Sequence, residues 1–249
     1  MLNILSTYGP LLLVGPYPNG PLGGLALTLL LSVLGVVLAF PLGVAIAIAR
    51  VSPHRAIAMP AAALVYLVRG VPLIMLVFWS YFLAPAVIGK PLSAFTTLVI
   101  TLVIYQAAYM SEVVRAGPES LPKGQTEAAR SLGLSYLKTL RRVLLPQALF
   151  NMLPALLSQF ISTVKETSIG YVISVQELTF ESSQVNSALL TSPFQVYLIL
   201  SLTYFVVCYS LTQVIHILER RVTNRRSTSS TKPAPENYDS VQQRRQVVR

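Results

Sequence analysis

The chain has 249 residues, of which 53% are hydrophobic and 11% are charged, and its formal net charge is +10. A soluble domain carries about 25% charged residues, whereas no charged residue precedes Arg50 here. The composition therefore excludes a soluble enzyme, a disordered chain and a fibrous protein, and it predicts an all-α, polytopic membrane protein.

Five mostly apolar runs are long enough to cross a bilayer, which takes about 20 residues in a helix. The predicted spans are residues 22–49, 57–84, 92–111, 143–164 and 194–218. The second run is interrupted by Arg69-Gly70-Val71-Pro72, and the fourth continues past Lys165 and Glu166 towards Val175. Prolines within the runs are compatible with spanning helices, because neighbouring helices satisfy the freed backbone groups.

The connections between the spans differ strongly in charge. Two basic residues lie between the first and second spans, six between the third and fourth, and eight after residue 218, so sixteen of the nineteen share one side. The connections on the opposite side contain one basic residue, Lys90. Because cytoplasmic connections carry the excess of Lys and Arg, this pattern predicts five transmembrane helices with the N-terminus outside and the C-terminus inside. Topology therefore explains the net charge, and we expect no nucleic-acid partner.

The sequence divides into two regions of different composition. Residues 1–221 form the predicted transmembrane domain. Residues 222–249 form a basic tail, rich in Ser, Pro and Arg, that cannot bury a core and is predicted to be disordered in the cytoplasm. The basic residues of this tail either contact anionic membrane lipid headgroups or are simply solvated.

The connection between the third and fourth spans, residues 117–146, has a pattern of its own. It predicts a short helix over residues 125–132, ended by Gly133 in the left-handed conformation that favours glycine. A second helix over residues 135–145 is predicted to end before Pro146. Two consecutive alanines keep the first helix thin enough to enter a groove on another protein. An amphipathic loop that rests on the membrane is the alternative.

One spaced pattern in this connection is specific. Glu127-Ala128-Ala129 is followed after three residues by Gly133, and after nine more by Val143-x-Leu145-Pro146. The pattern resembles the EAA loop of ABC-importer permeases, which prefers Ile at the place of Val143. Other segments are similar to the polar amino-acid branch of that family. They are residues 107–117, 146–148 and 165–168, and residues 69–73, where Val71 replaces a Thr. The resemblance covers about residues 22–221.

The resemblance implies a type I ABC-importer permease of the bacterial plasma (inner) membrane. Such a subunit pairs with itself or with a homologous permease, and a cytoplasmic ATPase dimer and an extracytoplasmic amino-acid-binding protein complete the importer. In this family the short helix of the EAA loop docks into a cleft on the ATPase. The residues expected to couple the two proteins are Glu127, Ala128, Ala129, Gly133, Leu134 and Pro146.

No catalytic pattern occurs in the chain. It lacks the G-x-x-x-x-G-K-[ST] phosphate loop and any paired metal-ligand spacing, and its two histidines lie near predicted membrane edges. We therefore expect a transport subunit that has no catalytic residue, metal site or cofactor of its own. ATP and Mg²⁺ are expected on the partner ATPase.

Three ionisable residues, Arg69, Lys165 and Glu166, lie within the predicted spans. Each costs about 2.5–3.5 kcal/mol at a helix centre, so a partner or a solvated cavity is expected. One hypothesis is a midplane amino-acid site, in which Glu166 faces the ammonium group and Arg69, or amides freed by Pro72, face the carboxylate. The candidate substrate-binding residues are Arg69, Gly70, Val71, Pro72, Glu166, Thr167 and Ser168. The alternative is an ion pair between Arg69 and Glu166 that joins two helices.

Two features favour an acidic amino acid as the substrate. The segment RGVPLIMLVFW, residues 69–79, resembles acidic amino-acid permeases. The charges within the spans, Arg69 and Lys165 against Glu166, leave one positive charge in excess. The alternatives are an ABC permease for another small polar solute and an ion-driven secondary transporter. A secondary transporter would need two inverted repeats, and five spans cannot be divided in that way.

Overall fold

The computed structural model describes residues 2–227, and the chain divides into two compact units, Met1–Ile215 and His216–Arg249. The second unit, as far as residue 227, belongs to helix α11. The described residues contain helices and no β-strand. The helical elements are α1 (Leu2–Val14), α2 (Gly24–Arg50), α3 (Arg55–Gly70), α4 (Leu73–Phe78), η1 (Trp79–Leu83), α5 (Ala84–Ile88), α6 (Ala94–Glu119), α7 (Lys123–Ser131), α8 (Tyr136–Thr139), η2 (Leu140–Leu144), α9 (Leu145–Glu166), η3 (Thr167–Ile173), α10 (Leu178–Leu189) and α11 (Pro193–Ser227).

Several of these segments are long and apolar enough to cross a membrane. Four are continuous: Gly24–Arg50, Ala94–Glu119, Arg141–Ile173 and Pro193–Ile217. A fifth span results if Arg55–Gly70 and Leu73–Ile88 are taken together, with a bend of 105° between them. The predicted class, an all-α polytopic membrane protein, is confirmed.

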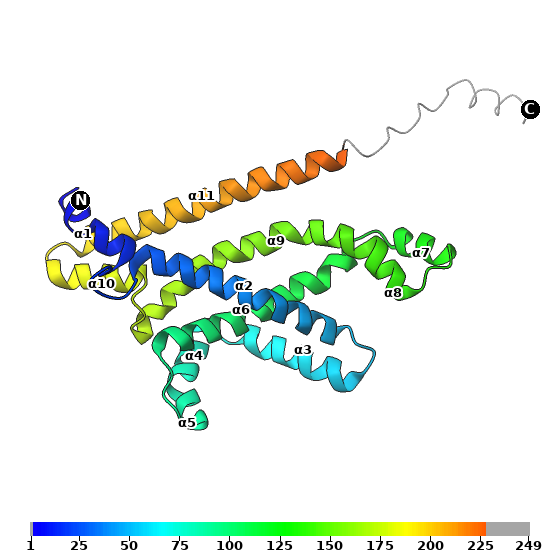
Figure 1. Cartoon of the computed structure of the whole chain (residues 1–249), viewed down its shortest axis with the longest axis horizontal. Helices are drawn as coiled ribbons and strands as arrows, with labels where there is room; N and C mark the ends of the chain where they lie inside the picture. The colour runs from blue at the N-terminus through cyan, green and yellow to red at the C-terminus, as the bar shows by residue number, and fades with distance from the viewer. Residues whose placement is uncertain (1, 228–249) are drawn as a thin grey trace, which may run out of the picture. The chain divides into compact units, whose positions relative to one another are not determined.

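The bend in the second span lies at Val71 and Pro72. Both residues have extended backbone, with φ −110° and ψ 136° at Val71 and φ −58° and ψ 138° at Pro72. Proline has no amide hydrogen, and its ring disfavours a helical residue before it. Helix α3 therefore ends at Gly70, and α4 and α5 turn away from the line of α3 (Figure 1).

The third span is longer than predicted. The prediction ended it at residue 111, before the charged residue Glu112, whereas α6 continues to Glu119. In the structure Glu112 forms ion pairs with Arg50 of α2 and Arg115 of α6. Because the charges at this end of the helix neutralise one another, they do not require the helix to stop.

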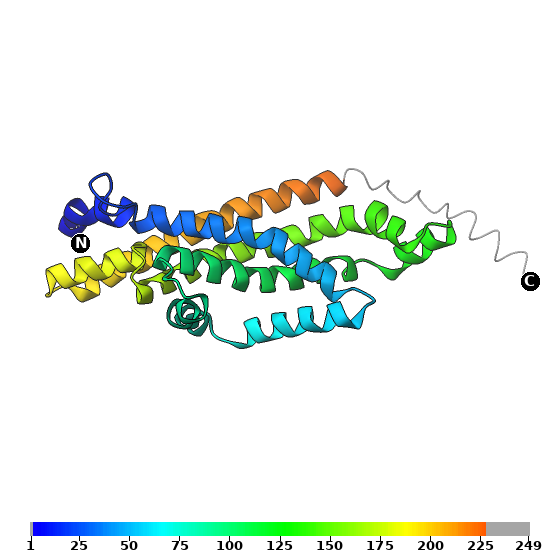
Figure 2. The same cartoon turned by 60° about the horizontal axis from the view of Figure 1, so that its bottom comes forward.

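Helices α2 and α6 form the centre of the first unit, and α9 and α3 lie beside them (Figures 1 and 2). A small residue permits the central contact: a Cβ atom at Gly43 of α2 would lie 3.0 Å from the Cβ of Met110 in α6. Apolar side chains fill the space around this contact in two clusters. The first includes Leu27, Leu31, Leu98 and Leu102, and the second includes Ala39, Val65, Val68, Ala107 and Met110.

Helices α1 and α10 lie at one end of the first unit (Figure 1). The sequence did not predict them, because each is shorter than a membrane span. Leu12 of α1 packs with Val185 of α10 and Val196 of α11 in an apolar cluster. The buried carboxylate of Glu177 accepts hydrogen bonds from two backbone amides in the first turn of α10, at 2.8 and 2.9 Å, and so caps this helix.

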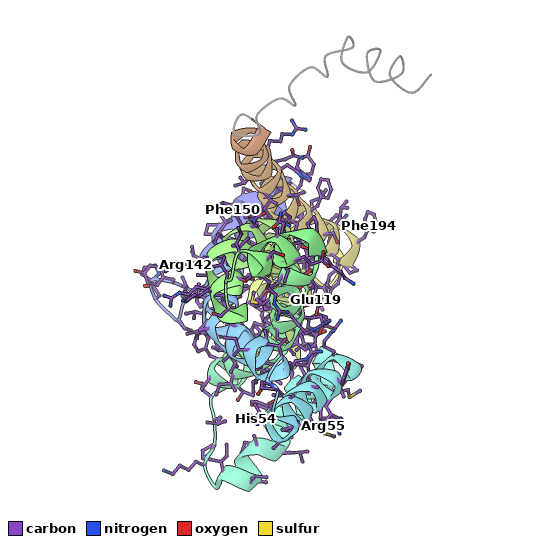
Figure 3. All side chains as sticks on the ribbon, turned by 90° about the vertical axis from the view of Figure 1, so that its right-hand side faces the viewer. His54, Arg55, Glu119, Arg142, Phe150 and Phe194 are labelled. Atoms are coloured by element: carbon purple, nitrogen blue, oxygen red, sulfur yellow. The ribbon has the colours of Figure 1, made fainter. Side chains whose placement is uncertain are left out.

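Helices α7 and α8 lie at the opposite end, at the start of α9 (Figure 1). Figure 3 looks onto this end, with His54, Arg55, Glu119 and Arg142 labelled. The prediction that the second helix ends before Pro146 is wrong, because α8 leads through the π-helical turn η2 directly into α9. Pro146 directly follows this π-helical turn, and such a local change of helical hydrogen bonding lets a spanning helix contain a proline without ending.

Candidate functional site

The first candidate site is the elbow, which we define as α7 together with residues 132–135. Helix α7 spans Lys123–Ser131, close to the prediction, and Gly133 has φ +80°, the left-handed conformation that was expected. The amide of Leu134 donates a hydrogen bond to the carbonyl of Ala129 at 3.2 Å. This bond closes the end of α7 and fixes the direction in which the chain leaves the helix.

The elbow presents a small surface with one prominent apolar side chain. Leu132, at its tip, is 83% exposed. Of the predicted coupling residues, Glu127, Ala128 and Gly133 are exposed, Leu134 is half-buried, Ala129 is buried, and Pro146 is exposed in α9. An exposed leucine beside short side chains is suited to a groove on another protein, because it fills a pocket while the helix approaches closely.

The elbow is joined to the fourth span by a side-chain hydrogen bond. Gln125 of α7 donates from Nε2 to Oε1 of Gln147 in α9 at 3.0 Å. Gln147 in turn donates to the backbone carbonyl of Val143 at 2.9 Å. Gln147 belongs to the segment 146–148 that resembles amino-acid permeases, but its bond to Gln125 depends on how α7 packs against α9, and no local sequence pattern predicts it.

The second candidate site surrounds Arg69, at the end of α3. Its Nη1 lies 3.7 Å from Oε2 of Glu112, and its guanidinium lies 5.0 Å from the centre of the Tyr109 ring. Glu112 also pairs with Arg50 and, at 2.5 Å, with Arg115. Three helices, α2, α3 and α6, therefore meet at one carboxylate.

Glu166, the predicted partner of the substrate ammonium, lies at the end of α9. Gln106 of α6 donates a hydrogen bond from Nε2 to the Glu166 carboxylate, and Gln159 of α9 donates to Oε1 of Gln106 at 2.5 Å. The alternative ion pair between Arg69 and Glu166 does not describe the structure, in which each of the two residues has a different partner. Sequence reasoning missed both glutamines because it searched the spans for charge alone.

A cavity of about 370 Å³ lies beside Arg69, between α3, α6 and α9. Its lining combines polar and small side chains: Arg69, Tyr109, Glu112, Val113, Ala116, Gly117, Ser120, Asn151, Met152, Ala155 and Gln159. Cavities of this size hold small molecules, and a few convergent polar groups fix their orientation. Gln159 lines the cavity and is bonded to Gln106, so it links the surroundings of Arg69 to those of Glu166.

The other predicted substrate residues are neighbours of Arg69 and Glu166 in the chain. Gly70 ends α3, and Val71 and Pro72 form the bend. Thr167 is fully buried, and its hydroxyl donates to the carbonyl of Val164 at 2.8 Å. Ser168 likewise donates to the carbonyl of Lys165, at 2.6 Å. The structure thus brings Arg69 to the cavity, whereas both hydroxyls, at the start of η3, donate to backbone carbonyls at the end of α9.

Comparison with known proteins defines the class of this chain. Residues 39–224 match the family described as the inner membrane component of binding-protein-dependent transport systems. The match covers most of the chain, which therefore belongs to this family and is a multi-pass protein of the inner membrane.

Individual relatives agree with this assignment. The chain is 37% identical over 202 residues to the probable glutamine ABC transporter permease protein GlnP of Bacillus subtilis (strain 168), which covers 80% of this chain and 92% of the relative. It is 31% identical over 207 residues to the glutamate/aspartate import permease protein GltK of Escherichia coli O157:H7, again covering 80% and 92%. The solved structure described as an amino acid ABC transporter with histidines matches with a TM-score of 0.77 and 35% identity, over 80% of this chain and 92% of that one.

Family membership has consequences for what the chain does. Its relatives are permease subunits of ABC transporters, which are transport components and not enzymes. The ABC permease family implies a separate ATPase and a second permease subunit as partners. Nothing in this family supports the ion-driven secondary transporter that was considered as an alternative.

Proposed function

We propose that the chain is the permease subunit of an ATP-driven amino-acid importer, with its N-terminus outside and its C-terminus inside. The names of its relatives, which include permeases for glutamine, cystine, glutamate and arginine, support an amino-acid substrate. The orientation is supported by the basic residues of the sequence, since Arg55 at the start of α3 and the basic elbow connection occur at the same end (Figures 1 and 3).

The elbow is the proposed contact with the ATPase, and the exposed Leu132 beside the left-handed Gly133 is the observation that carries this proposal. Glu127 and Ala128 lie exposed on the same short helix, and Ala129 and Leu134 fix its end. ATP with Mg²⁺ is bound and hydrolysed by the partner. A change in the ATPase then moves α7, and α9 follows because α7 is bonded to it.

The domain boundaries follow from this assignment. Residues 1–221 constitute the permease domain, with the coupling loop at residues 117–146. Residues 222–249 are a basic cytoplasmic tail whose Lys and Arg side chains contact anionic lipid headgroups. Most of this tail, residues 228–249, lies outside the residues that the structure describes.

The substrate site involves the cavity beside Arg69 and the carboxylate of Glu166. Arg69 is 37% exposed and can donate to a substrate carboxylate, while Glu166 supplies the negative charge for an ammonium group. The bend at Val71 and Pro72 leaves backbone groups near Arg69 outside a helix, as is usual where a transport path passes.

An acidic amino acid, glutamate or aspartate, is the substrate we favour. Around Glu112 three guanidinium groups, those of Arg50, Arg69 and Arg115, face two carboxylates, those of Glu112 and Glu119, so that one positive charge is in excess. This excess suits an anionic side chain. Glutamine is a second candidate, because the relative GlnP is named for glutamine. An extracytoplasmic binding protein delivers the substrate.

Gly133→Asp tests the proposed coupling. The permease is reconstituted in proteoliposomes with a candidate ATPase and binding protein, and ATP hydrolysis and amino-acid uptake are measured together. Aspartate adds a side chain at φ +80° and a charge at the docking surface, so uptake per ATP hydrolysed should fall about 10-fold or more. Gly124→Ala, in the same short helix, is the matched control and should leave this ratio unchanged. An unchanged ratio in Gly133→Asp would exclude the elbow as the ATPase contact.

A further inference from the structure

Arg69 is the most loosely held of the three guanidinium groups around Glu112. Arg50 forms a close pair with Oε2 of Glu112, and its side chain is only 7% exposed. Arg115 holds the other oxygen, Oε1, at 2.5 Å from Nη2 and at 3.1 Å from Nε. Arg69 approaches Oε2 only to 3.7 Å, which is beyond hydrogen-bond distance, and it is the most exposed of the three.

The exposed side chain of Arg69 lines the cavity. Arg69, Tyr109 and Glu112 lie on its wall together with Gln159. The Tyr109 ring supports the guanidinium through a cation–π contact at 5.0 Å. An anion within the cavity therefore meets a guanidinium that is already oriented by an aromatic ring and whose hydrogen-bond donors are not saturated by Glu112.

We propose that Glu112 is a built-in competitor for the carboxylate of the transported amino acid. Arg69 binds the substrate carboxylate in the cavity, and when the cavity holds no substrate Glu112 supplies the counter-charge. This proposal rests on the proposed function, because it gives Glu112 a part in setting the substrate affinity of the same site.

The energetics of a charge in the membrane make such a competitor useful. A guanidinium without any anion is costly at membrane depth, so Arg69 requires a counter-charge in every state of the transport cycle. A substrate carboxylate can form the shorter, two-pronged hydrogen bonds that Glu112 does not form with Arg69. When the substrate leaves, Glu112 compensates Arg69 again, and this lowers the cost of release.

The proposal makes opposite predictions for the two residues of the pair. Arg69→Gln removes the donor and should raise the half-saturation concentration for uptake about 10-fold or more. Glu112→Gln removes the competing charge but keeps an oxygen for Arg50, and it should lower the half-saturation concentration about threefold. Glu112→Asp keeps the negative charge on a side chain that is one methylene shorter. The carboxylate then lies further from Arg69, and the half-saturation concentration should again fall.

The experiment measures ATP-dependent uptake of glutamate and of glutamine by the reconstituted importer. Thermal unfolding of each purified variant identifies any that fails to fold, and Glu112→Asp then replaces Glu112→Gln. Arg55→Gln is the matched control, since Arg55 is an exposed arginine at the start of the same helix, α3, and does not line the cavity; the half-saturation concentration of this variant should not change.

The two substrates identify which carboxylate is bound. A loss in Arg69→Gln for both substrates indicates the α-carboxylate, and a loss for glutamate alone indicates the side-chain carboxylate. Unchanged or weaker affinity in folded Glu112→Gln and Glu112→Asp would overturn the role of Glu112, even if amino-acid uptake itself is normal. Absence of ATP-dependent uptake in the unmodified importer would instead overturn the proposed function.

Discussion

Gln125 on the elbow and Gln147 on the fourth span are joined by a hydrogen bond of 3.0 Å between their side-chain amides. Gln147 also donates to the carbonyl of Val143 at 2.9 Å, within the π-helical turn that leads into α9. A displacement of α7 by the ATPase is therefore transmitted to the span by a directional polar contact as well as by the covalent chain.

Gln125→Leu tests this connection. Leucine removes the hydrogen bond, and it also removes the Oε1 atom of Gln125, which is buried without a partner. We therefore expect thermal stability to change little, while the number of amino acids transported per ATP hydrolysed falls severalfold. Ser131→Ala is the control, because that hydroxyl donates to the carbonyl of Glu127 within α7 and not to α9 among the described residues. If both variants keep the wild-type ratio, the Gln125–Gln147 bond has no part in coupling.

Glu166→Gln tests the ammonium side of the substrate site. The substituted amide is neutral and close in shape, and it still has an oxygen that can accept from Gln106. Folding should therefore be retained, whereas the affinity for the amino acid should fall about 10-fold or more, because a charge-assisted hydrogen bond is lost. Uptake assays over a range of substrate concentrations provide the measurement. Normal affinity would show that Glu166 is a structural residue.

The stability of the chain should depend on pH through Glu177. Burial raises the pKa of its carboxyl to about 7, although the amides of Thr179 and Phe180 and the Tyr204 hydroxyl oppose this shift. The folded chain then retains a proton that the unfolded chain loses near its ordinary pKa of about 4.5. Stability should therefore fall as pH rises from about 4.5 to 7 and should level off above that.

Thermal unfolding of the purified permease at several pH values measures this slope. Glu177→Gln removes the titrating group and keeps a capping oxygen, so its melting temperature should depend less on pH. Burial also raises the pKa of Glu181, one turn further along α10, so some slope should remain until Glu181→Gln is added. If the melting temperature of Glu177→Gln depends on pH as strongly as that of the unmodified chain, Glu177 is not the group responsible.

The packing of α2 on α6 is tested by Gly43→Leu. A Cβ atom there would already lie 3.0 Å from the Met110 Cβ and 3.1 Å from the carbonyl oxygen of Ala107, so the helices must move apart. Overpacking of this kind costs about 1–3 kcal/mol, and the melting temperature should fall. Gly124→Ala, in α7, meets no atom within 4 Å and should stabilise its helix slightly. Equal melting temperatures for the two variants would exclude a tight α2–α6 contact.

The spans were predictable because hydrophobic length determines them directly. The bend at Pro72 and the turn at Gly133 were predictable for local reasons, since each depends on the restricted backbone of one residue. The continuation of the helix past Pro146 was not predictable, because it depends on the π-helical turn just before the proline, which no local sequence pattern indicates.

The site was only partly predictable. Charge within an apolar run identified Arg69 and Glu166, but not their partners, which depend on how the helices pack. Glu112 lies 43 positions after Arg69, and Gln106 lies 60 before Glu166, so no local pattern links either pair. A search of the spans for neutral polar residues would have found Gln106 and Gln159.

The most direct test of an ATP-coupled amino-acid permease uses the unmodified chain in proteoliposomes, with a cytoplasmic ABC ATPase and an amino-acid-binding protein from the same importer. ATP hydrolysis is measured with and without the substrate-loaded binding protein, and uptake of the amino acid is measured in parallel. We predict that the loaded binding protein stimulates hydrolysis severalfold and that uptake requires ATP. Ion-driven uptake by the chain alone, with no stimulation of any ATPase, would contradict this function.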